Sequence, residues 1–192
     1  EIDIDYLLED LRNLVVETLE EADRVRAFAG ELAHFSRAEE EEFRPADLNE
    51  CLRDAMHAVR ELFKGRATLD RRLGNLPPTR CLPGRMTRVF TDLLADAARA
   101  VRAPGVVRVR SWLEDGSIRV SVGDAGREIP GEMPRRVFEP FSRAGEDGKT
   151  EEGLALSVAY DIVRNHGGEI EVRSGSGKGT TFVVTVPLVK GD

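Results

Sequence analysis

Two aspartates four residues apart, Asp92 and Asp96, are the first residues of this 192-residue chain that could do chemistry. If the segment is helical, residues at this spacing lie on one face, so the two carboxylates are neighbours. Carboxylate oxygens are ligands for hard divalent cations, but like charges at this spacing also repel by about 0.2–0.5 kcal/mol. A solvated acidic helix face is the commoner explanation for such a pair taken alone.

A second candidate lies at Glu151-Glu152-Gly153, where a helical pattern begins. The first amides of a helix lack intrahelical partners and carry the positive end of the helix dipole, so a helix that starts near Gly153 could bind phosphate groups. Glu151 and Glu152 bring two carboxylates to that point. Each should stabilise the helix start by about 0.3–1 kcal/mol and repel a polyphosphate. A loop leading into an ordinary acidic-capped helix explains the segment almost as well.

The elements that position these residues follow from hydrophobic periodicity and turn residues. Asp47, with Glu50 three residues later, predicts a helix start, and its buried face would be Leu48, Leu52, Ala55, Val59 and Leu62. A longer helix is predicted at about 84–102, with inward residues Met86, Val89, Phe90, Leu93, Leu94, Ala97 and Val101. A third helix is predicted at 153–166, before Gly167-Gly168.

Strands alternate with these helices. They are predicted at 67–73, 79–82, 106–113, 118–123, 169–173 and 180–188, with a hairpin turn at Glu114-Asp115-Gly116-Ser117. Helices on one face of a mixed sheet, an α+β two-layer sandwich, is the architecture that these elements predict.

The N-terminal segment has a different pattern. Between residues 5 and 37, Gly30 is the sole Gly or Pro, and apolar residues recur every three or four positions, close to heptad spacing. Packing on the chain's own globular part would cover the resulting apolar face, but the length and the spacing favour a dimerising helix. An acidic linker, Glu39–Glu42, follows, so we expect two domains, residues 1–38 and residues 39–192.

Four short segments then occur in a fixed order: Asp92-Leu93-Leu94-Ala95-Asp96-Ala97-Ala98-Arg99, Asp124-Ala125-Gly126, Val137-Phe138-Glu139-Pro140-Phe141 and Gly153-Leu154-Ala155-Leu156-Ser157. They resemble the N, G1, F and G2 boxes of the catalytic domain of sensor histidine kinases, which binds ATP with the Bergerat fold shared by gyrase and a family of heat-shock chaperones. Residues 5–37 resemble the second helix of a dimerisation hairpin, and residues 43–189 resemble the catalytic domain. The resemblance implies a two-layer α/β sandwich of this ATPase type, preceded by a long dimerisation helix.

The resemblance implies roles for residues at the base end of a nucleotide site. Asp124 would accept the adenine amino group, and Gly126 would let backbone approach the base. Thr180, which follows Gly179, would flank the nucleotide.

It also implies roles at the phosphate end. Arg99 would lie near the phosphates, although an Arg at this spacing from Asp96 is more often a surface salt bridge. Gly153 would lie where the phosphate-binding helix begins. Asp96 would hold Mg²⁺, in place of the family's Asn. Asp92 lies where gyrase-type ATPases carry a general base, so it could in principle activate water. A gyrase-like ATPase that uses Asp92 is the least favoured of the three interpretations.

Four positions depart from the family pattern: Asp96, Glu128, Glu151 and Ala155. Two of them add negative charge beside the phosphates, and a carboxylate ~4 Å from a phosphate costs about 4 kcal/mol at an effective dielectric of about 20 unless Mg²⁺ lies between them. We therefore favour a degenerate module, a pseudokinase that acts in two-component signalling. It would dimerise through residues 5–37 and dock a response regulator or a partner kinase. The alternative is an active catalytic domain that uses ATP and Mg²⁺ and whose acceptor His lies outside this chain.

The three histidines do not supply that acceptor, which the family places in a His-Glu or His-Asp context. His34 falls at the close of the predicted dimerisation helix, and His57 lies in mid-helix. His166 ends a helix before two glycines, a favourable place for a cation, and the resemblance implies a structural role for it.

Composition bears on the possible partners and on the cellular compartment. The net charge of −7 argues against non-specific nucleic-acid binding, and 33% charged with 41% hydrophobic residues describes a globular protein. Cys51 and Cys81 lack metal-ligand spacing and fit a reducing compartment. Without a membrane-length apolar run or a signal peptide, we expect a cytoplasmic chain with no membrane contact of its own. Because it opens on Glu1-Ile2-Asp3, we expect a fragment of a longer protein.

Overall fold

The computed structural model describes residues 11–16, 18, 42–126, 129, 136–139, 151–175 and 179–189, with backbone alone at 151–154. The chain divides into two compact units, residues 1–40 and residues 41–192. In the first unit, the described residues are helical, and Leu11, Leu14 and Val15 expose about half of their surface. The rest of the helix predicted over 5–37 lies outside the described residues, so the helix, its dimer and the boundary at residue 38 stay predictions.

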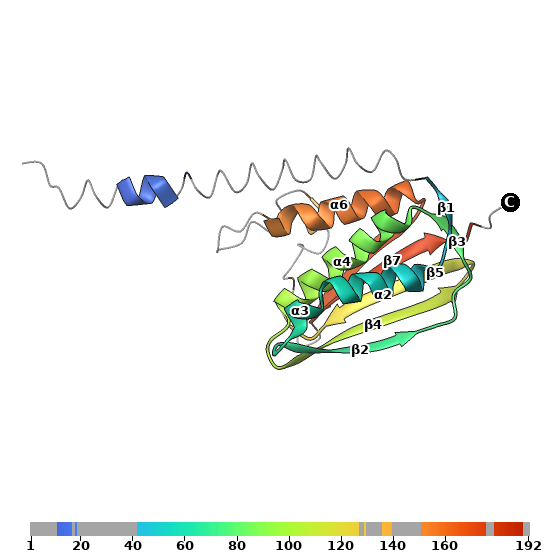
Figure 1. The fold of residues 1–192 in the computed structure, drawn as a ribbon, viewed down its shortest axis with the longest axis horizontal. Coiled ribbons are helices and arrows are strands. Elements are labelled where there is room, and N and C mark those ends of the chain that lie inside the picture. The colour runs from blue at the N-terminus through green and yellow to red at the C-terminus, as the bar shows by residue number, and fades with distance from the viewer. Residues whose placement is uncertain are drawn as a thin grey trace, which may run out of the picture. The chain divides into compact units, whose positions relative to one another are not determined.

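A five-stranded mixed sheet forms one layer of the second unit. Its strand order is β2-β4-β5-β7-β6, and its strands are β2 (Ala67–Leu73), β4 (Gly105–Glu114), β5 (Ser117–Asp124), β6 (Glu169–Gly175) and β7 (Gly179–Pro187). β2 runs parallel to β4, and the other neighbours are antiparallel. The long helices lie together on one face of this sheet (Figure 1). The predicted α+β two-layer sandwich is confirmed.

Helix α2 (Leu48–Ala58) begins where the capping pattern predicts. The Asp47 side chain accepts a hydrogen bond from the amide of Asn49 at 2.8 Å. The helix ends at Ala58 and is followed by a separate four-residue helix, α3 (Arg60–Phe63). The break changes which of the following side chains face the core. Phe63 is buried and Leu62 is 42% exposed, so the prediction that Leu62 faces the core is wrong.

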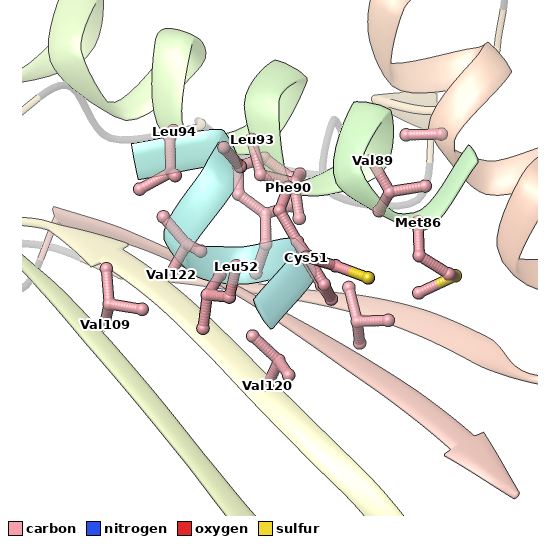
Figure 2. Close-up of a cluster of buried hydrophobic side chains, with 14 of the residues drawn as sticks. Cys51, Leu52, Met86, Val89, Phe90, Leu93, Leu94, Val109, Val120 and Val122 are labelled. Carbon is pink, nitrogen blue, oxygen red and sulfur yellow. The ribbon is translucent and has the colours of Figure 1, made fainter. Parts of the chain in front are cut away.

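Helix α4 (Pro83–Ala100) provides much of the core. Pro83 occupies the first helical position, where its missing N–H removes no hydrogen bond. All seven predicted inward residues of this segment are buried: Met86, Val89, Phe90, Leu93, Leu94, Ala97 and Val101. Figure 2 shows several of them packed against side chains of α2 and of the sheet, including Leu52, Val109, Val120 and Val122.

Turns and caps account for the remaining connections. Asp115 and Gly116 both have positive φ, 49° and 72°, as the tight turn of the β4–β5 hairpin requires. Helix α6 (Glu151–Asn165) ends in a Schellman motif, in which the amide of Gly168 donates to the Val163 carbonyl at 3.0 Å. A short strand, β1 (Arg44–Ala46), pairs with β3 (Thr79–Cys81) in a separate two-stranded sheet that the sequence did not predict.

The break between α2 and α3 makes a stability prediction. Phe63→Ala should lower the free energy of unfolding by about 3–5 kcal/mol, because it empties a buried site. Leu62→Ala should change it by less than about 0.5 kcal/mol, because the side chain is largely exposed. Urea unfolding of the two variants measures both values. A larger loss at Leu62 than at Phe63 would mean that the helix continues unbroken.

Candidate functional site

Asp124 and Thr180 lie side by side where β5 and β7 meet at one end of the sheet. They are directly paired in the register of the two strands, and both are buried, at 3% and 1% exposure. One carboxylate oxygen of Asp124 accepts a hydrogen bond from the amide of Gly126 at 2.8 Å. The Thr180 hydroxyl lies 3.2 Å from the Ser174 hydroxyl. Two of the three residues predicted for the base end, Asp124 and Thr180, therefore lie together in a pre-organised and largely desolvated setting.

Sequence reasoning missed Ser174, which connects three parts of this end. Its hydroxyl accepts from the amide of Ile129 at 2.8 Å and lies 3.2 Å from the carbonyl oxygen of Gly179. A serine in a glycine-rich turn carries no signal of such a role, because turn serines are common for local reasons. Ser174 ties the loop after Asp124 to the start of β7.

The two glycines at this end are required by contacts within the protein. A Cβ on Gly126 would lie 2.0 Å from the carbonyl oxygen of Ala100, at the end of α4. A Cβ on Gly179, where φ is +70°, would lie 2.0 Å from the carbonyl oxygen of Asp124. Backbone therefore passes close to both glycines without any ligand. The contact of Gly126 with Ala100 also brings the end of α4 to the end of β5.

Asp92 and Asp96 both lie on α4. Asp96 is only 6% exposed, and the Asp92 carboxylate lies 3.5 Å from Nε of Arg88, one turn earlier. Arg99 is exposed near the end of the same helix. The prediction that the aspartates share a solvated acidic face is thus wrong for Asp96, which is buried. Arg88 was missed, although its spacing of four from Asp92 is a recognised pairing signal.

Helix α6 begins at Glu151, two residues before the predicted start. Glu151 and Glu152 are therefore the first two helical residues, and Gly153 is the third. The amide of Leu82, at the start of α4, donates to His166, just after the end of α6, so the two helices run in opposite directions. The start of α6 consequently lies towards the end of α4 that carries Asp96 (Figure 1).

His166 is a buried, neutral structural residue. Its Nε2 accepts from the Leu82 amide at 3.0 Å, so Nδ1 carries the proton and donates to the Ile162 carbonyl at 2.7 Å. The Phe43 ring packs on it at 5.1 Å between centroids. These contacts hold His166 as a structural residue, the role that the resemblance implies for it. His57 is exposed, and His34 lies outside the described residues.

The described part of the aromatic segment is held by packing contacts. Val137 is buried, and the Phe138 ring lies 5.4 Å from Tyr160 and 6.2 Å from Phe182. These contacts anchor the short described segment 136–139 to α6 and β7. Glu128, one of the four departures from the family pattern, lies outside the described residues.

The family resemblance implies MgATP, and the two ends of the predicted site differ in the residues that would meet it. The base end offers a buried carboxylate and hydroxyl already held in place. At the phosphate end, the first turn of α6 carries Glu151 and Glu152, and α4 carries the buried Asp96 carboxylate. No cluster of three or more His, Cys, Asp or Glu side chains that could hold a metal occurs among the described residues. The base end therefore offers groups suited to a nucleotide, and the phosphate end carries acidic residues.

Comparison with known proteins identifies the family. A family model described as histidine kinase-, DNA gyrase B- and HSP90-like ATPase matches residues 81–190. The chain therefore belongs to this ATPase family, and its second unit is a catalytic domain of the sensor histidine kinase type. No described helix is long and apolar enough to cross a membrane.

Individual relatives are sensor kinases. The chain is 30% identical over 170 residues to the sensor histidine kinase ZraS of Escherichia coli K12, covering 88% of this chain and 36% of ZraS. It is 34% identical over 170 residues to the C4-dicarboxylate transport sensor protein DctB of Rhizobium meliloti, covering 85% of this chain and 26% of DctB. It thus spans about a third or less of the length of these relatives.

Solved structures share the fold. The catalytic domain of histidine kinase ThkA superposes with a TM-score of 0.66 at 25% identity, covering 78% of this chain and 99% of that domain. Full-length ShkA in complex with AMPPNP superposes with a TM-score of 0.74 at 23% identity, covering 94% of this chain and 39% of ShkA.

The packing of Gly126 makes a prediction that is independent of nucleotide. Gly126→Ala should destabilise the domain by about 1–3 kcal/mol, because the added methyl overlaps the backbone of Ala100. Gly175→Ala is the matched control, since a Cβ there meets nothing within 4 Å. Thermal unfolding without ligand measures both. Equal stability of the two variants would mean that Gly126 is kept for a ligand and that packing does not require it.

Proposed function

We propose that this chain is a sensor-kinase module with a degenerate ATP site, a pseudokinase that acts by dimerising and docking a response regulator or a partner kinase. The observation that carries the proposal is the start of α6 at Glu151, which makes two glutamates the first residues of the helix that should receive the phosphates.

Attractive and repulsive charges meet at the phosphate end of the site. Free amides and the positive end of a helix dipole attract phosphate, but acidic residues in the first turn use the same dipole for their own stabilisation. The buried Asp96 adds a further carboxylate at this end of α4. A single carboxylate about 4 Å from a phosphate, at an effective dielectric of about 20, costs on the order of 4 kcal/mol. That cost corresponds to roughly a thousandfold in affinity.

The signalling role is supported by the relatives and by the N-terminal unit. ZraS and DctB are sensor proteins, and the exposed Leu11, Leu14 and Val15 are suited to burial against another helix. A domain that keeps a well-packed core while losing its phosphate site is suited to binding other proteins. The module would then signal by binding a partner protein and by the way it holds that partner, and it would transfer no phosphoryl group itself.

An active catalytic domain is the second candidate. It is supported by the intact base end, where Asp124 and Thr180 are buried and paired, and by the ability of Asp96 to act as a hard ligand for Mg²⁺. In that case the acceptor histidine would lie outside this chain. The two candidates differ in one measurable quantity, the affinity for MgATP.

Calorimetric titration with MgATP tests the proposal through substitutions that remove the charges. The wild-type chain should give no binding heat at millimolar MgATP. Glu151→Gly combined with Glu152→Thr, and separately Asp96→Asn, should each raise the affinity by about tenfold or more, because each removes repulsion near the phosphates. Asp161→Asn, at an exposed position further along α6, is the control for removal of one charge and should have no effect.

Micromolar binding by the wild-type chain would contradict the proposal and support the active domain. Failure of every charge-removing variant to bind, with thermal stability retained, would show that charge is not what closes the site.

A further inference from the structure

No described helix of the second unit covers the second face of the five-stranded sheet. All of the long described helices pack on the other face (Figure 1). Along β4 the buried residues Val107, Val109 and Ser111 alternate with partly or fully exposed ones, so the exposed set points away from the helices. Sheets with mainly antiparallel strands commonly leave one face in water. Residues on that face are not needed to fill the core, so their types can indicate a function.

Arginine dominates the β2–β4–β5 part of this open face. We call it the arginine face, and it comprises Arg72, Arg108, Arg110, Arg119 and Trp112. Strand register brings the members together: Arg72 pairs with Arg110 across β2 and β4, and Trp112 pairs with Arg119 across β4 and β5. Trp112 is the single tryptophan of the chain and is partly exposed.

Two carboxylates offset only part of this charge. Asp70 lies 2.6 Å from Nη2 of Arg110, and Glu114 lies 2.7 Å from Nη1 of Arg119. Arg72 and Arg108 are exposed, and the described part of the chain gives neither an ion pair. The hydrogen bond from Arg110 lowers the pKa of Asp70, and the charges of Arg72 and Arg108 lower it further. The local field on this face is therefore positive.

The positive face stands out against the charge of the whole chain. Residues 1–42 contain fourteen acidic and four basic residues, whereas residues 43–192 contain twenty-one acidic and twenty-four basic residues. The net charge of −7 thus arises entirely from the N-terminal segment. The catalytic unit itself is mildly basic.

Protection of a sheet edge does not account for the cluster. Charged residues on an edge strand discourage edge-to-edge pairing, which would explain Arg72 on β2. Arg108 and Arg119 lie on β4 and β5, inside the sheet, where no edge needs protection. Like charges directly opposite each other on neighbouring strands, as with Arg72 and Arg110, are also destabilising.

We propose that the arginine face is a docking surface for a partner protein that presents a cluster of carboxylates. This inference deepens the proposed function, in which the module works by binding another protein, and it rests on that function. Tryptophan and arginine are the residue types that contribute most to protein interfaces, and guanidinium groups bind carboxylates in bidentate geometry. Asp70 and Glu114 lie within the face and would oppose a continuous polyphosphate, which favours a protein over nucleic acid or a lipid surface.

Trp112 provides the measurement. The full chain is titrated with a short oligoglutamate peptide as the carboxylate probe, and Trp112 fluorescence is followed. The wild type should give a saturable, salt-sensitive change. Arg72→Glu combined with Arg108→Glu should weaken binding by about tenfold or more. Arg53→Glu combined with Arg60→Glu, an equal charge change at exposed positions of α2 and α3, should behave as wild type.

Three results would overturn the proposal. The first is equal binding by the two double variants. The second is a response to inorganic polyphosphate or to phosphatidylglycerol vesicles as strong as the response to oligoglutamate. The third is a salt-dependent emission shift without any probe, which would identify the chain's own acidic residues as the occupant. Nucleotide plays no part in this titration, so tight MgATP binding would overturn the proposed function and leave this result unaffected.

Discussion

Burial of the apolar face of α4 against the sheet and α2 is the interaction on which the other features depend. Phe90, Leu93 and Leu94 are fully buried in that contact, and their positions fix the rotation of the helix about its axis. The same rotation buries Asp96 in the next turn. Core and candidate site therefore share one helix.

Most of the fold could be predicted because its signals are local. The inward residues of α4, the turn at Asp115-Gly116 and the cap at Asp47 are set by periodicity, positive φ and hydrogen bonding within a few residues. The pairing of β1 with β3 and the parallel pairing of β2 with β4 join distant segments, so no local pattern revealed them. The break after α2 was not predicted because adjacent positions are both apolar. Leu62 would face the core if the helix continued, and Phe63 faces it because the helix breaks.

The candidate site divides in the same way. Order and residue type located Asp124 and Thr180, and the strand register places them together. Two features could be found only in the structure: Gly126 is required by the backbone of Ala100, and the Ser174 hydroxyl joins the loop after Asp124 to the start of β7. The arrangement of the base end is thus held by packing and hydrogen bonds within the protein, without any ligand.

The central claim is that the phosphates of a nucleotide are repelled while the base end remains competent. The most direct test compares the affinities of adenosine and MgATP for the wild-type chain by NMR titration, following the amides of Asp124 and Thr180. Adenosine should bind at least as tightly as MgATP, since the phosphates then add nothing favourable. MgATP binding about tenfold or more tighter than adenosine would contradict it, because the phosphate end would then be attractive.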